Sequence, residues 1–277
     1  MKRFASLVGV VVVGVGLNGC ALRMNGGGDS ITASEASEAL DEASASAQAA
    51  DLTSASIDVA TNFTIGQAAE QAAAELSAFI ASQLPCAGVT LAGSTLTVVY
   101  GAKLGNCTYN GHTFSGTQTL TITKLGTSSV EVDHTWSSFS NGVVSVSGSA
   151  QVTWDFANPS RHVVHDLTWT RLWDGRQGHG TGDRLQTPLA GGIAVGFQED
   201  GSRTWDGTSG HWDLSIDAVQ MRWADPVPQA GSYTLTLPNL KTVTMSFSRV
   251  DDNTIRVTVS TTKSSFGFNV TRTGQTS

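Results

Sequence analysis

The chain has 277 residues, of which only 14% are charged, well below the roughly 25% that is typical of soluble domains. Its formal net charge is -7, and it contains no run of lysine and arginine that could neutralise phosphates. This composition argues against a nucleic-acid-binding protein. It favours an exported, β-rich protein whose surface consists largely of neutral hydroxyl groups.

Residues 1–19 have the composition of an export signal. A basic head, Lys2 and Arg3, precedes an apolar run of thirteen residues from Ala5 to Leu17. A membrane-spanning helix needs roughly 20 such residues, so the run is too short to span a bilayer and is typical of a cleaved signal peptide.

The end of this run, Leu17-Asn18-Gly19-Cys20, resembles the lipobox of bacterial lipoproteins. The resemblance implies that the leader is cleaved before Cys20 and that this cysteine carries acyl chains, such as palmitate, which hold the protein on a membrane. Ala21 in place of an aspartate after the cysteine implies sorting to the outer membrane, facing either the periplasm or the cell surface.

Residues 20–64 are rich in alanine, serine and acidic side chains. Nine acids and one base lie between Cys20 and Leu84, and almost no large apolar side chain occurs from Met24 to Asp58. Such a segment buries too little apolar surface to offset the entropy of ordering, so we expect a flexible or partly helical spacer. The alternative is a packed helical domain.

Residues 65–84 show the spacing of an amphipathic helix. Apolar side chains recur at steps of three and four residues, which places them on one helical face, and Pro85 ends the pattern. We expect this helix to dock on the domain that follows. The recurring residues are Ile65, Ala69, Ala72, Leu76, Phe79, Ile80 and Leu84.

Residues 85–277 alternate between apolar and hydroxyl side chains in about a dozen segments separated by short turns. Val152, Trp154 and Phe156, for example, alternate with Thr153 and Asp155. This period of two is typical of half-buried antiparallel strands. The predicted fold is all-β, either a large antiparallel meander or sandwich or a curved open sheet, with the 65–84 helix packed on it. A membrane-spanning barrel would alternate in the same way, but the irregular strand lengths and the lipoprotein-type signal oppose it.

With Cys20 acylated, two cysteines remain, Cys86 and Cys107. In an oxidising envelope compartment we expect them to form a disulfide, which would stabilise the fold by roughly 3 kcal/mol.

One aromatic ladder could be a binding platform. Period-two alternation places Trp169, Arg171 and Trp173 on one strand face, and His179 lies in the glycine-rich segment 174–183, which we interpret as a mobile hairpin loop. Such a ladder could bind sugar rings or a protein partner. Alternatively, it fills the inside of a curved sheet.

We predict no catalytic residues, metal or cofactor. His211, Asp213 and Ser215 share a strand face, but the acid lies between the other two, which is the wrong order for a nucleophilic triad. His162 and His165 are three residues apart and face opposite sides of a strand, so they cannot share a metal ion without a bulge.

Three hypotheses for function remain. The leading one is a lipid-anchored envelope protein whose non-catalytic β-domain binds a protein, polysaccharide or lipid. The second is a carrier that holds acyl chains in a hydrophobic trough between helix and sheet. The third is an envelope hydrolase with catalytic groups near His162, His165, Asp166 and the glycine-rich segment.

Overall fold

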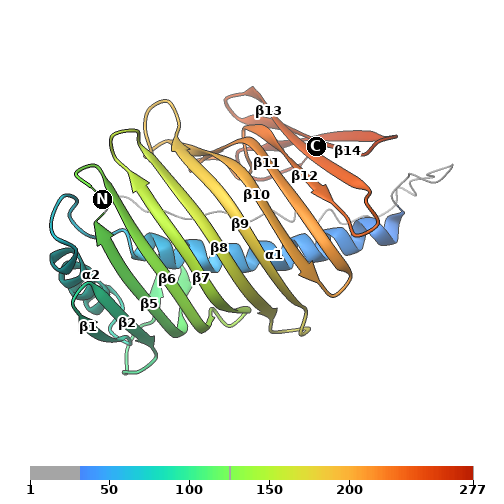
Figure 1. The fold of residues 1–277 in the computed structure, drawn as a ribbon. Coiled ribbons are helices and arrows are strands. Elements are labelled where there is room, and N and C mark those ends of the chain that lie inside the picture. The colour runs from blue at the N-terminus through green and yellow to red at the C-terminus, as the bar shows by residue number, and fades with distance from the viewer. Residues whose placement is uncertain (1–31, 125, 277) are drawn as a thin grey trace.

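The computed structural model describes residues 32–124 and 126–276, which form two helices and fifteen strands (Figure 1). The helices are α1 (Ala33–Val59) and α2 (Ala69–Gln83). The strands are β1 (Gly88–Ala92), β2 (Thr95–Tyr100), β3 (Thr108–Tyr109), β4 (His112–Thr113), β5 (Ser115–Lys124), β6 (Ser129–Ser140), β7 (Val144–Asp155), β8 (Ser160–Arg171), β9 (Gln177–Pro188), β10 (Gly196–Gly207), β11 (Gly210–Arg222), β12 (Ala230–Thr236), β13 (Thr242–Asp251), β14 (Thr254–Ser260) and β15 (Ser265–Thr271). The predicted signal peptide and Cys20 lie outside the described residues.

Thirteen of the strands form one antiparallel sheet, in which neighbours in space are neighbours in sequence. The order is β1-β2-β5 and then β6 to β15 in succession, while β3 and β4 form a separate hairpin. The sheet is open, with β1 and β15 as its edges. The predicted antiparallel meander is therefore confirmed in its open-sheet form, and the described residues do not form a two-sheet sandwich.

Helix α1 lies across one face of this sheet, and its course corrects the prediction of a spacer. It runs over the strands rather than away from them (Figure 1), and its 27 residues begin at a capping box in which Thr32 and Glu35 bond to each other's backbone N–H groups. We call the face against α1 the inner face and the opposite one the outer face. The expectation of a flexible spacer is wrong for residues 33–59.

Small side chains explain how α1 can be buried without an apolar stripe. Ala45, Leu52 and Ser56 are fully buried, and most of the alanines and serines between them are buried too. Short side chains need little space, so alanine and serine can fill positions where larger side chains would not fit.

Helix α2 confirms the predicted amphipathic helix and its docking. Ala72, Leu76 and Ile80 are buried, and the helix packs on β1, β2 and β5. It begins at Ala69 rather than at Ile65, because Gly66 has a φ of +87° that a continuing helix does not allow. Ile65 is exposed and does not belong to the apolar face.

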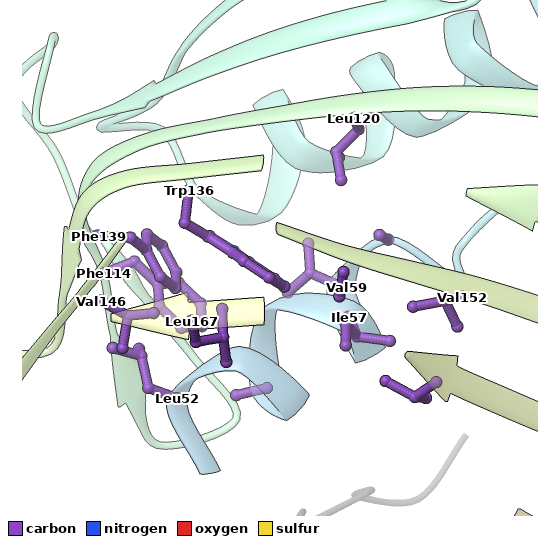
Figure 2. Packing of buried hydrophobic residues seen from close by; sticks show 14 of the residues in the cluster. Leu52, Ile57, Val59, Phe114, Leu120, Trp136, Phe139, Val146, Val152 and Leu167 are labelled. Carbon is purple, nitrogen blue, oxygen red and sulfur yellow. The ribbon is translucent and has the colours of Figure 1, made fainter. Parts of the chain in front are cut away.

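The main core lies between the two helices and the inner face (Figure 2). Leu52, Ile57 and Val59 of α1 pack in one cluster with Trp136, Phe139 and other sheet residues. A smaller second cluster joins Val227, in the segment before β12, to the inner side of β13, β14 and β15. Without the helices and the segment around Val227, the apolar side chains of the inner face would be exposed to solvent. The two clusters together bury that face.

Cys86 and Cys107 are at bonding distance and form the predicted disulfide, with their Cα atoms 5.3 Å apart. The bond links the segment after α2 to the segment before β3. It fixes the end of α2 beside the first strands of the sheet.

The glycine-rich segment 174–183 is not a mobile loop, because most of it belongs to β9. A Cβ atom on Gly178 would collide with the ring of Trp169, and one on Gly182 would collide with the ring of His165. Glycines on the inner side of β9 thus leave room for large rings from neighbouring strands. Packing therefore explains why glycine occurs at every second position from Gly178 to Gly182.

Candidate functional site

The predicted platform does not form as one exposed surface. Trp169 and Arg171 are each only 3% exposed, because they lie on the inner face under α1, whereas Trp173 is 70% exposed in the β8–β9 turn. His179 points to the outer face, where it bonds to Asp166. The alternative interpretation, that the ladder fills the inside of the sheet, is correct for Trp169 and Arg171.

Acidic side chains along α1 bind basic side chains of the inner face and of the turns at one end of the sheet. Glu42 is fully buried and lies 2.7 Å from Arg176, which also binds Glu38 at 2.7 Å. At the two ends of α1, Glu35 pairs with Lys241 at 2.7 Å and Asp58 pairs with Arg161 at 2.8 Å. The hydrogen bonds to Arg176 and Ser209 lower the pKa of Glu38, and those to Lys241 and Thr32 lower the pKa of Glu35 to about 2.

The space between α1 and the sheet is filled. The cavity found there, lined by Ala49, His165, Trp169 and Arg203 among others, measures about 20 Å³, which is room for one water molecule. An acyl chain needs far more space. This cavity is therefore too small for an acyl chain, and it lies under α1 rather than under the 65–84 helix, where the carrier hypothesis places its trough.

Two histidines are buried under the helices and are held neutral. Burial lowers the pKa of His134 to about 3 and that of His165 to about 2, and nearby arginines add to both shifts. Gln118 lies 3.1 Å from Nδ1 of His134, while Nε2 of that ring has no partner among the described residues. His134 is fully buried, whereas His165 is partly buried and also borders a hollow on the opposite face of the sheet.

The outer face carries a hollow of about 460 Å³ across β7, β8, β9 and β10. Strand register places two rows of side chains in it, one of Gln151, Val164, Asp183 and Ser202 and one of Ser149, Asp166, Thr181 and Thr204, with Gly182 and His165 completing the lining. We call this the outer hollow. Short hydroxyl side chains make it shallow, and its lining is rich in groups that accept or donate hydrogen bonds.

Two histidine–aspartate pairs hold the carboxylates of the outer hollow. Nε2 of His162 lies 2.6 Å from Asp183, and Nε2 of His179 lies 2.8 Å from Asp166. Asp166 and Asp183 are diagonal neighbours on β8 and β9, which places them roughly 7–8 Å apart. Within the described chain, neither imidazole bonds to a serine or threonine hydroxyl, so no nucleophilic trio is formed.

His211, Asp213 and Ser215 lie on the outer face as expected of a solvated polar surface. His211 binds Asp206 at 2.8 Å and lies 3.4 Å from Asp213, and these carboxylates raise its pKa. Asp206 is the register partner of both His179 and His211, so this group continues the polar surface beyond the outer hollow.

The outer hollow was not predicted from the sequence, although His162 and Asp166 were considered for catalysis. The alternation assigns Asp166 and Asp183 to one kind of face, but only strand register brings them together. No three histidine, cysteine, aspartate or glutamate side chains within residues 32–124 and 126–276 cluster as metal ligands would. Neither described helix is long and apolar enough to cross a bilayer.

Comparisons with protein-family models, with curated proteins and with solved structures found no match to this chain.

Proposed function

We propose that this chain is a lipid-anchored protein of the bacterial outer membrane whose outer hollow binds a polysaccharide without cleaving it. The observation that carries the proposal is the contrast between the two faces of the sheet. The inner face is filled by α1, with a cavity of about 20 Å³, whereas the outer hollow offers about 460 Å³ lined by hydroxyl, amide and carboxylate groups. A polar ligand fits this surface better than a lipid does.

The chemistry of the outer hollow favours a particular kind of glycan. Carboxylates accept hydrogen bonds from pairs of sugar hydroxyls, and serine and threonine hydroxyls both donate and accept. Val164 is the apolar side chain of the lining, which contains no tryptophan, tyrosine or phenylalanine. Asp166 and Asp183 would repel an acidic polymer, so neutral or amino sugars are the expected ligands.

The anchor rests on the resemblance of Leu17-Asn18-Gly19-Cys20 to a lipobox. Two or more acyl chains hold a protein stably on a bilayer, whereas one chain holds it only reversibly. Mass spectrometry of the protein from its native host tests this directly. Diacylglyceryl and N-acyl groups on Cys20 are expected, and an intact leader or an unmodified thiol would overturn the anchor.

A glycan-binding experiment tests the outer hollow. Full-length protein in detergent is screened against neutral, amino and acidic glycans, and the double variant Asp166→Asn with Asp183→Asn is expected to lose at least tenfold in affinity. Asp217→Asn, on the exposed side of β11, is the matched control and should bind as the wild type does. Equal binding by both variants, with unchanged circular dichroism, would exclude the outer hollow as the site.

Hydrolysis is the second candidate function, because His162–Asp183 and His179–Asp166 lie within hydrogen-bond distance. Both carboxylates are mostly exposed, whereas a general acid is normally desolvated. Incubating the bound glycan with the protein and assaying new reducing ends separates the two functions. Product that disappears in His162→Gln or His179→Gln would favour the hydrolase over the binding protein.

A further inference from the structure

We infer that one end of the sheet contacts the membrane surface through a row of apolar turn residues. Large apolar side chains protrude from successive connections at this end, and we call them the apolar rim: Leu104, Val143, Leu172, Trp173 and Leu240. This inference rests on the proposed lipid anchor, and it names the surface with which the anchored protein meets the bilayer.

The rim residues share one end because the sheet is an antiparallel meander. Successive hairpins alternate between the two ends, so the connections after β2, β6, β8 and β12 lie at the same end. Hydrogen bonds join neighbouring turns there: Leu172 N–H donates to the carbonyl of Val143 at 2.8 Å. Glu38 bridges the next two turns by binding Arg176 and Ser209.

Apolar side chains such as Phe156, Ile193 and Val250 are exposed at the opposite end too, and scattered ones are normal, but the three most exposed large apolar side chains of the described residues all belong to the rim. Trp173 is 70% exposed and Leu240 is 83% exposed. Basic side chains accompany them at the surface: Lys103 precedes Leu104, and Lys241 follows Leu240. The Trp173 ring itself rests 4.4 Å from the buried guanidinium of Arg171, which fixes the ring at this end of the sheet. Tryptophan beside lysine or arginine is typical of segments at the headgroup level of a bilayer.

The start of α1 directs the anchor toward the same end. Glu35, in the first turn of α1, bonds to Asn239 at 2.6 Å and to Lys241 at 2.7 Å in the β12–β13 turn. From Cys20 to Thr32 the chain can span at most roughly 40 Å. The 12-residue strands are themselves about 40 Å long. A chain that started at Thr32 would therefore have to be fully extended for Cys20 to reach the opposite end of the sheet.

Fluorescence quenching tests the contact. Full-length acylated protein is placed in phosphatidylethanolamine and phosphatidylglycerol vesicles that contain lipid brominated near the headgroup. Trp173 should account for most of the quenching, so Trp173→Phe is expected to reduce it at least twofold. Trp223→Phe, in the β11–β12 connection at the opposite end, should leave the quenching unchanged.

The outcomes separate this inference from the proposed function. Acylated, vesicle-bound protein whose quenching is the same in wild type and Trp173→Phe would overturn the rim contact and leave the anchor intact. Absence of acyl groups on Cys20 would overturn both. Self-association in detergent that is lost in Leu172→Ser and Leu240→Ser would show that the rim binds a second copy of the chain, and would also overturn the membrane contact.

Discussion

The indole Nε1 of Trp205 donates a hydrogen bond of 3.1 Å to Oε1 of Glu42, joining α1 to the middle of the sheet across 163 residues of sequence. The other carboxylate oxygen of Glu42 accepts from Arg176 at 2.7 Å. Gly207 makes this possible, because a Cβ atom at that position would occupy the space of the carboxylate. The buried acid, the indole and the glycine therefore form one docking point for the helix.

Replacing Glu42 should weaken the docking of α1. Glu42→Ala leaves Arg176 with Glu38 and the more distant Asp174, and it leaves the Trp205 N–H buried without an acceptor, so we expect a loss of about 3 kcal/mol in the free energy of unfolding. Glu42→Gln keeps an oxygen for the indole and should cost less. Urea unfolding measures both, with the more exposed Glu35→Gln as the control. A Glu42→Ala variant as stable as Glu35→Gln would contradict this role.

The glycines of β9 should resist substitution for steric reasons. In Gly182→Ala the new methyl group meets the His165 ring, and overpacking of this kind typically costs about 1–3 kcal/mol. Gly126→Ala is the matched control, since the nearest atom there, Ser129 Oγ, is 3.7 Å from the added carbon. Thermal unfolding should show a clear drop in Tm for the first variant alone. Equal melting of the two would mean that the space beside His165 is not tight.

Stability should fall as pH drops below 6.5. His134 and His165 have folded pKa values of about 3 and about 2, whereas an unfolded histidine titrates near 6.5, so the unfolded chain takes up protons first. Stability is thus complete above pH 6.5. At pH 5 each histidine removes up to about 2 kcal/mol.

Urea unfolding at pH 7.5 and pH 5.0 measures this effect. The difference between the two conditions should shrink in His165→Gln, which cannot take up the proton. At pH 5 the carboxylates of Glu35 and Asp174, whose partners lower their pKa values to about 2, are still ionised, so they do not blur the result. A pH-independent midpoint for the wild type would show that the two rings are accessible to protons.

Breaking the Cys86–Cys107 bond should lower stability without unfolding the sheet. The bond closes a separation of 21 residues, which corresponds to about 3 kcal/mol in the chain-entropy model. For a domain of this size that is a Tm decrease of roughly 6–12 °C. Cys86→Ser with Cys107→Ser, compared with wild type with and without reductant, measures it. A reductant that has no effect on the wild type would argue that the bond is absent.

Much of the sheet could be predicted from the sequence, because strand formation depends on local alternation. Val152 and Trp154 alternate with Thr153, and these residues lie in β7 as expected. The apolar side chains that recur from Ala69 to Leu84 likewise predicted α2 and its packing on the sheet. The expected pairing of Cys86 with Cys107 is also present.

The position of α1 could not be predicted, since its signal is not local. Its buried side chains are mostly alanine and serine, which give no apolar periodicity, and its acids find their partners more than 100 residues away in Arg161, Arg176 and Lys241. Trp169 and Arg171 were placed on one strand face, but which face is covered depends on α1. The outer hollow could not be predicted either, because its lining residues come together only through the register of β7, β8, β9 and β10.

The sequence separation of these contacts bears on how the molecule is assembled. The segment that forms α1 is synthesised before the sheet, yet its partner Arg161 lies 103 residues later and its partner Lys241 lies 206 residues later. The C-terminal end of the helix can therefore settle once β8 is made, whereas its N-terminal end has to wait for the β12–β13 turn. Docking of α1 would then proceed backwards along the helix as the sheet grows.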